Sequence, residues 1–296
     1  MMQTFRRIRA KAARSRIRIP QVWSWHLGLE PQDTFLASYP RSGSTWLRFI
    51  LFEILTGEEP GFQDIEKRLP EIDMHRGRPP ILPGGGRLIK THEKYRNDYK
   101  KAVYLVRDLR DVVLSCYARA VGCNLASLVS KGDFDSFLLS LLEGRALAMG
   151  SWQKHSWSWL NSPLAKNGNL MVVRYEDLRQ NSEQVIEQLL QFLGVTRDVR
   201  IIRKAIENNT VQQMRAKEDS AIRSGRHSIL LGSRKSADED GRFVRKGTIE
   251  GWRGKLTDAQ VKIIQQYAGD ALAAAGYEAG MAAERRPQST TAALSI

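Results

Sequence analysis

The stretch YPRSGSTWLR, residues 39–48, places small hydroxyl residues and one glycine between two apolar runs. The run before it has the composition of a buried strand. The run after it has apolar residues at helical spacing, with Ser44 as a plausible cap and Gly57 as a stop. A short polar turn between a strand and a helix leaves backbone N–H groups available to bind an anion. The stretch therefore predicts an anion-binding loop.

Other polar and cationic side chains come at the ends of predicted strands. One such strand ends in Lys90, Thr91 and His92, a second ends at Arg107, and a third ends at Tyr175. Strands that alternate with helices predict a mostly parallel sheet flanked by helices. Ligands of such sheets lie beyond the carboxyl ends of the strands, so we expect a single α/β domain with one site at that edge.

The loop alone does not identify the anion. It has fewer glycines than the GxxxxGK[ST] loop of nucleotide triphosphatases, and no lysine precedes its Ser/Thr pair. A nucleotide kinase of related architecture also predicts an aspartate at a strand end for Mg²⁺, which the sequence does not offer. That alternative is therefore disfavoured.

Five segments, taken in chain order, resemble the sulfotransferases that use 3′-phosphoadenosine 5′-phosphosulfate (PAPS). They are YPRSGSTWL at 39–47, KTH at 90–92, Arg107 followed by Ser115 in YLVRDLRDVVLSCY, YEDL at 175–178, and RKGTIEGW at 245–252. Together they cover about residues 34–257. The resemblance implies a PAPS-dependent sulfotransferase with the three-layer, P-loop NTPase-like α/β fold.

PAPS carries anionic groups on both sides of its ribose, and the resemblance implies a pocket for each. The 5′-phosphosulfate is expected at Arg41, Ser42, Gly43, Ser44 and Thr45. The 3′-phosphate is expected at Arg107, Ser115, Arg245, Lys246 and Gly247. Guanidinium groups bind phosphate through two parallel hydrogen bonds, which suits the two arginines. The adenine is expected beside Trp46 and Tyr175.

Transfer of a sulfuryl group to a hydroxyl needs a base for the acceptor proton and cations for the leaving oxygen. His92 is the expected base, because the pKa of histidine is ordinarily near neutrality. Lys90 and Arg41 are expected to hold the oxygens of the transferring group. Arg41 stands where the family has lysine, so it keeps the charge but cannot give up a proton. The expected product is adenosine 3′,5′-bisphosphate (PAP), and no metal is expected.

The sequence departs from the family at two further places. Val211 stands where the family has an aromatic residue near the adenine, and Asp258 and Lys262 replace two residues of the family's dimer motif. We therefore do not expect that dimer. The acceptor is expected to bear a hydroxyl, and a lipid, a phenol, another small alcohol and a glycan all stay open. Its pocket is expected from residues 58–87, 117–160 and 224–244.

The chain of 296 residues has a formal net charge of +14. Residues 1–19 hold seven of the basic residues and no acid, which predicts a basic arm over 1–24, a sulfotransferase domain over 25–279 and a tail over 280–296. The arm could contact an anionic membrane surface or lie in solvent. A membrane-surface or nucleic-acid binder is an alternative, but it would need none of the five segments, and we expect no nucleic acid.

The expected location is the cytoplasm, with peripheral contact at the inner membrane surface left open. The sequence has no apolar run of about 18 residues and no apolar signal segment near residue 1. Only two cysteines are present, Cys116 and Cys123, and we expect both to be reduced.

Overall fold

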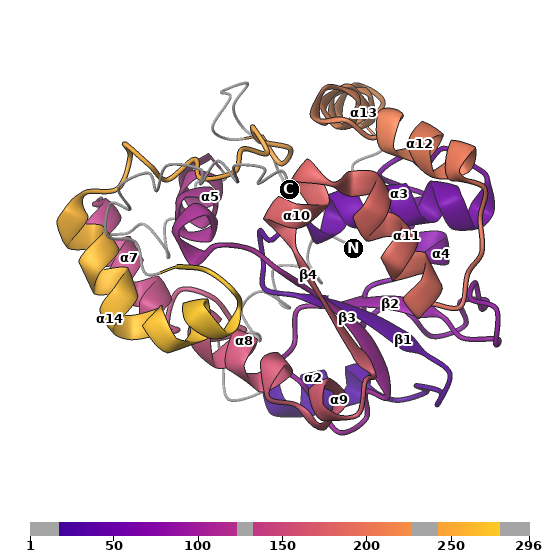
Figure 1. Ribbon diagram of the computed structural model, residues 1–296, viewed down its shortest axis with the longest axis horizontal. Coiled ribbons are helices and arrows are strands. Elements are labelled where there is room, and N and C mark those ends of the chain that lie inside the picture. The colour runs from indigo at the N-terminus through magenta and orange to yellow at the C-terminus, as the bar shows by residue number, and fades with distance from the viewer. Residues whose placement is uncertain (1–17, 123–132, 226–241, 279–296) are drawn as a thin grey trace, which may run out of the picture.

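A computed structural model describes residues 18–122, 133–225 and 242–278. Its four strands form one sheet in the order β2-β1-β3-β4 (Figure 1). They are β1 (Thr34–Ser38), β2 (Leu88–Thr91), β3 (Lys101–Val106) and β4 (Leu170–Arg174). All three pairings are parallel, so the predicted parallel sheet is confirmed.

Helices cover both faces of this sheet and give three layers (Figure 1). One face packs against α3 (Ser44–Thr56), α4 (Ile65–Arg68), α10 (Tyr175–Gln180), α11 (Ser182–Phe192), α12 (Val199–Glu207) and α13 (Val211–Arg223). The other packs against α2 (Arg18–Trp25), α5 (Leu109–Gly122), α7 (Phe134–Leu142), α8 (Trp152–Leu160), α9 (Pro163–Lys166) and α14 (Asp258–Ala274).

The central strand β1 shows why the layers form. Leu36 points to one apolar cluster, whereas Phe35 and Ala37 belong to the other, and all three are buried. Successive side chains of a strand point to opposite faces, so a strand covered on both sides must be apolar throughout. The continuous apolar run before the anion-binding loop is thus the sequence signature of the middle layer.

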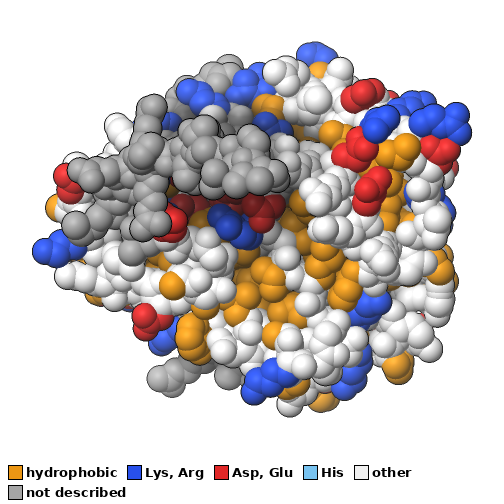
Figure 2. Space-filling model, viewed as in Figure 1, with side chains coloured by type: hydrophobic (Ala, Val, Ile, Leu, Met, Phe, Trp, Pro, Cys, Tyr) orange, Lys and Arg blue, Asp and Glu red, His pale blue; other side chains and the backbone are white. Residues whose placement is uncertain are grey.

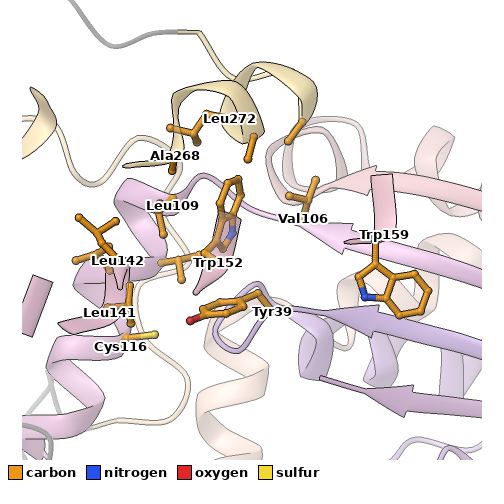
Figure 3. Packing of buried hydrophobic residues seen from close by; sticks show 14 of the residues in the cluster. Tyr39, Val106, Leu109, Cys116, Leu141, Leu142, Trp152, Trp159, Ala268 and Leu272 are labelled. Carbon is orange, nitrogen blue, oxygen red and sulfur yellow. The ribbon is translucent and has the colours of Figure 1, made fainter. Parts of the chain in front are cut away.

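The apolar cluster that contains Phe35 and Ala37 also contains two tryptophans, which come from a segment expected to line the acceptor pocket. Trp152 and Trp159 are fully buried, and Figure 3 shows Trp152 close to Leu109 and Leu142. Both indoles therefore serve the core beneath the sheet. Packing, which explains most aromatic residues at helical spacing, is their role here.

Some local expectations are confirmed and others are wrong. The spacing of Thr257 and Gln260 in the sequence predicts a capping box at the start of α14, and it is present, with each side chain bonded to the other residue's backbone. Ser44 is the first residue of α3, and Gly43 rather than Ser44 is the N-cap. Helix α13 lies in a stretch to which the sequence assigned no element, because its residues are strongly polar.

Several apolar side chains are exposed on the face of the molecule that Figure 2 shows. Val172 of the edge strand β4, Trp157 of α8 and Tyr267 of α14 are each between 41% and 48% exposed. Apolar atoms are common on the surfaces of folded proteins, so these residues do not by themselves mark a site.

Parts of the predicted organisation fall beyond what the structure describes. Helix α2 begins at Arg18, within the segment expected as a basic arm. The rest of that arm, Cys123 and the tail from 279 onward lie outside the described residues. Across the described ranges, every helix is too short or too polar to cross a bilayer.

Candidate active site

The predicted anion-binding loop joins β1 to α3. Two residues of the loop have positive φ, Arg41 at 71° and Gly43 at 97°. A Cβ placed on Gly43 would lie 2.7 Å from Cδ2 of Tyr175, so the backbone passes too close to that ring for any side chain. Because the first N–H groups of a helix have no partner within it, Ser44 and Thr45 present donors at this end of α3.

A cavity of about 330 Å³ opens at this loop. Twelve of the fourteen predicted site residues line it: Arg41, Gly43, Ser44, Thr45, Trp46, Lys90, His92, Arg107, Ser115, Tyr175, Arg245 and Gly247. Ser42 is fully buried beneath the loop, and Lys246 lines a neighbouring cavity instead. The structure therefore brings together residues that are up to two hundred positions apart in the chain, while their individual roles stay predictions.

The neighbouring cavity, of about 40 Å³, holds the residues expected to bind the 3′-phosphate. Arg107, Ser115, Arg245, Lys246 and Gly247 line it, together with Lys255 and Asp111. The carboxylate of Asp111 lies 3.6 Å from Nη2 of Arg107. Burial raises the pKa of Asp111 to about 6, although Arg107 opposes the shift. This cavity is thus cationic, with one buried acid that sequence reasoning missed.

Arg41 extends across the loop toward the second cavity. Its Nε donates to Oγ of Ser115 at 2.9 Å, and its Nη2 donates to the carbonyl of Phe243 at 3.0 Å. Burial lowers the pKa of Arg41 to about 10, and the neighbouring cations Arg119, Arg245 and Arg107 act in the same direction. The guanidinium is still charged at neutral pH, so Arg41 supplies a fixed cation between the two cavities.

His92 is held in one tautomer. Its Nδ1 lies 2.6 Å from the carbonyl oxygen of Ser38, and a carbonyl can only accept, so Nδ1 carries the proton. The lone pair is therefore on Nε2. Register explains the contact, because Ala37 pairs with Thr91 and brings the next residues of β1 and β2 side by side. His155 also fixes the backbone of His92, because its Nε2 donates to the His92 carbonyl at 3.1 Å.

The same surroundings keep His92 neutral. Burial lowers its pKa to about 3, the nearby ammonium of Lys90 adds to this effect, and Glu71 opposes it. At neutral pH the ring is therefore unprotonated at Nε2 and able to accept a proton.

Lys90 forms an ion pair that the sequence did not reveal. Its Nζ lies 2.6 Å from Oε1 of Glu71, a residue that also lines the main cavity. Burial raises the pKa of the Glu71 carboxyl, but Lys90 and Arg48 outweigh burial and bring it to about 2. Glu71 comes from the irregular segment before β2, where it had no recognisable motif.

The far side of the main cavity is aromatic and cationic. Trp46 donates its Nε1 to the carbonyl of Asn209 at 2.7 Å, and its ring meets Tyr175 edge-on at 6.0 Å between centroids. The guanidinium of Arg179 lies 5.2 Å from the Trp46 ring. Val211, which replaces the family's aromatic residue, also lines the cavity. This arrangement gives a base-sized aromatic wall in the place that was expected for adenine.

The expected acceptor segments contribute unequally. Residues 58–87 supply Glu71, and 224–244 supplies Phe243 and Val244, whereas the described part of 117–160 supplies none of the cavity's lining. Most of the third expected segment, residues 226–241 of 224–244, lies outside the described residues. Arg179 also lines the cavity without having been predicted, because it lies just beyond the YEDL motif on α10. Met214 lines the cavity as well, three residues after Val211 in the segment that the resemblance places near the adenine.

Within the part of the chain that the structure describes, no three His, Cys, Asp or Glu side chains are grouped so as to hold a metal ion. The expectation of metal-free chemistry stays a prediction.

A family model described as the sulfotransferase domain matches residues 31–276. Sulfotransferase 1A1 of Rattus norvegicus is 28% identical over 250 residues, which cover 78% of this chain and 81% of that protein. Sulfotransferase 2A1 of Macaca fascicularis is 26% identical over 246 residues, covering 79% and 82%.

Two solved structures share the fold. A mouse sulfotransferase complexed with PAP superposes with a TM-score of 0.59 at 21% identity, covering 82% of this chain and 84% of that one. A retinol dehydratase in complex with retinol and PAP gives a TM-score of 0.62 at 21% identity, covering 84% and 83%. The predicted P-loop NTPase-like α/β architecture is therefore confirmed. With a family model that spans most of its length, the chain belongs to the sulfotransferase family.

Proposed function

We propose that the protein transfers a sulfuryl group from PAPS to the hydroxyl of an acceptor, with His92 as the base. The observation that carries this proposal is a single cavity lined by the anion-binding loop, by Arg107 and Arg245, and by His92 in its proton-accepting tautomer. Structural neighbours that were solved with PAP support the choice of nucleotide.

The donor would be held at two anionic groups. Its 5′-phosphosulfate would lie at the N-terminus of α3, where Gly43, Ser44 and Thr45 present backbone N–H groups and hydroxyls. Its 3′-phosphate would lie in the smaller cationic cavity with Arg107 and Arg245. Hydrogen bonds to charged groups contribute about 1.5–3 kcal/mol each, which is more than the helix dipole supplies.

The transfer itself needs one proton acceptor and one stabilised leaving group. The acceptor oxygen attacks sulfur while its proton passes to Nε2 of His92. The bond between sulfur and the bridging oxygen breaks, and its electron pair stays on the 5′-phosphate of PAP. Arg41 and the loop N–H groups would offset that charge. The anionic donor also raises the basicity of His92 from its low value, because opposite charge favours the protonated ring.

The acceptor class rests on the remaining lining. Phe243 and Val244 add apolar surface near the loop, which suits an alcohol or phenol on an apolar body. The solved retinol dehydratase binds retinol in one structure and androsterone in another. Both are apolar molecules that bear a hydroxyl, so they are reasonable first acceptors to test here.

The test combines binding with turnover. Calorimetric titration with PAP should show association, and incubation with ³⁵S-labelled PAPS and a panel of alcohols, phenols or cell extract should label the acceptor. His92→Asn should abolish labelling while PAP still binds, because the Asn amide can donate to Ser38 as Nδ1 does but offers no base. An enzyme that keeps its turnover in this variant would refute the base, and a protein that binds no PAP would refute the whole proposal.

A further inference from the structure

The main cavity contains one carboxylate, Glu71, that the chemistry above does not use. It lies at the same end as Lys90 and His92, and its side chain is 25% exposed while that of Lys90 is 5% exposed. An acid among groups that must bind a nucleotide with two separate anionic groups is unexpected on electrostatic grounds alone, because like charges repel most strongly where water is excluded. A specific role for Glu71 would explain its presence there.

The backbone fixes Glu71 opposite Lys90. The segment around Glu71 runs parallel to β2 and bonds to it on both sides of Lys90: the amide of Ile72 donates to the Lys90 carbonyl at 2.8 Å, and the Lys90 amide donates to the Pro70 carbonyl at 2.8 Å. Residues paired in this way project from the same face of a sheet. The 2.6 Å contact between the two side chains is therefore consistent with this backbone pairing.

A buried arginine supports the carboxylate from below. Nη1 of Arg48 lies 3.7 Å from the same Oε1 atom that Lys90 contacts, and the Arg48 side chain is fully buried. Arg48 also pairs with Glu66 at 3.1 Å, and Glu66 accepts from the Glu71 amide at 3.0 Å. Glu71 would therefore keep a cationic partner even if Lys90 turned toward another anion. Lys90 can therefore leave Glu71 for another anion without leaving the carboxylate of Glu71 unpaired.

We propose that Glu71 is a counterion that competes with the sulfuryl group of the donor for the ammonium of Lys90. This inference rests on the proposed function. The sulfuryl oxygens of the donor would draw Lys90 toward them, and Glu71 would recover it once the sulfuryl group has left. Glu71 thereby limits how tightly Lys90 holds the donor, and it keeps the sulfated, anionic product from being trapped at the same ammonium.

Comparison of two nucleotides tests this idea, because PAPS has the sulfuryl group and PAP lacks it. Glu71→Gln should lower the Kd of PAPS about 5-fold, which corresponds to about 1 kcal/mol, and change that of PAP less than about 2-fold. The control Glu183→Gln removes the same charge from α11, where Glu183 forms an exposed ion pair with Arg203 of α12. This control should change the Kd of neither nucleotide. Titration calorimetry without acceptor measures all six dissociation constants, those of PAPS and PAP for the wild type and for each of the two variants.

A double-mutant cycle shows whether the effect passes through Lys90. In a Lys90→Met background, Glu71→Gln should no longer change the affinity for PAPS. If it tightens PAPS by the same factor there, the effect is a general one of charge and the proposal is wrong. If Glu71→Gln does not fold, Glu71→Asp withdraws the carboxylate by one methylene and should shift PAPS binding in the same direction by a smaller factor.

The two proposals fail in different ways. Wild-type protein that binds neither nucleotide refutes the proposed function itself. Wild-type protein that binds both, with a Glu71→Gln variant whose PAPS and PAP affinities change by equal factors, leaves the sulfotransferase assignment standing and refutes the role of Glu71.

Discussion

Helix α3 offers a matched pair of glycines for testing how the donor loop is built. Gly43 is its N-cap and Gly57 its C-cap, and both have positive φ, 97° and 77°. A Cβ at Gly43 would lie 2.7 Å and 2.8 Å from two ring atoms of Tyr175, whereas a Cβ at Gly57 would meet nothing within 4 Å. Alanine at the two positions therefore differs mainly in the contact with Tyr175.

The magnitudes follow from these two contributions. A left-handed backbone costs a residue with a side chain about 1–2 kcal/mol, and this applies to both variants. Gly43→Ala must also displace a ring that is 5% exposed and lies under the guanidinium of Arg107 at 4.3 Å. Overpacking of this kind costs about 1–3 kcal/mol. We expect Gly43→Ala to lower the free energy of unfolding by about 2–5 kcal/mol and Gly57→Ala by about 1–2 kcal/mol.

Urea unfolding measures the difference in stability between the two variants, and titration with PAP measures the difference in their affinity for the nucleotide. Gly43→Ala should weaken PAP binding by about 10-fold or more, because a shift of the loop by a few tenths of an ångström misaligns several charge-assisted hydrogen bonds at once. Gly57→Ala should bind PAP as the wild type does. Equal losses of stability in the two variants, or unchanged PAP affinity in Gly43→Ala, would refute the close approach of Tyr175 as the reason for glycine.

Two further predictions concern the smaller cavity. Arg107→Ala should weaken PAP binding by about 10-fold or more, since it removes a charged partner of the 3′-phosphate, while the exposed Arg145→Ala should not; equal calorimetric affinities for PAP would remove Arg107 from that pocket. Because the pKa of Asp111 is raised to about 6, the folded state holds a proton that the unfolded state releases between about pH 4 and 6, so wild-type stability should fall over that range by up to about 3 kcal/mol relative to Asp111→Asn. If the free energy of unfolding in urea changed with pH in the same way for the wild type and for Asp111→Asn, this prediction would be contradicted.

The sequence predicted the parts of this site that come from strand ends and local motifs. Arg107 could be named as a strand-end residue because it follows an apolar run directly, and parallel strands bring such positions to one edge. Gly43 and His92 come a few residues after an apolar run, and their expected roles came from the resemblance of their motifs to the sulfotransferase family. The layers were predictable because buried parallel strands are apolar throughout.

Other lining residues depend on contacts that no local pattern records. Glu71 reaches the cavity only because an irregular segment bonds to β2, and Arg179 only because α10 brings it to the lining one turn after Tyr175. The tautomer of His92 depends on its contact with Ser38, which is 54 positions away in the chain. Trp152 and Trp159 were expected among the segments of the acceptor pocket, but they fill the core, which is the more common role of aromatic residues at helical spacing.

The hydrogen bond between Ser38 and His92 ties the proton-accepting ring to the last residue of the strand that leads into the donor loop. The carbonyl of Ser38 thus sets the distance between the anion-binding loop and the His92 ring, and the hydrogen-bonded pairing of β1 with β2 holds both in place. The segment around Glu71 extends this hydrogen-bond ladder through its pairing with Lys90, whereas Phe243 reaches the cavity from a segment outside the sheet. On the proposed function, substitution of the Phe243 side chain would change the apolar surface offered to an acceptor while the hydrogen bond between Ser38 and His92 stays in place.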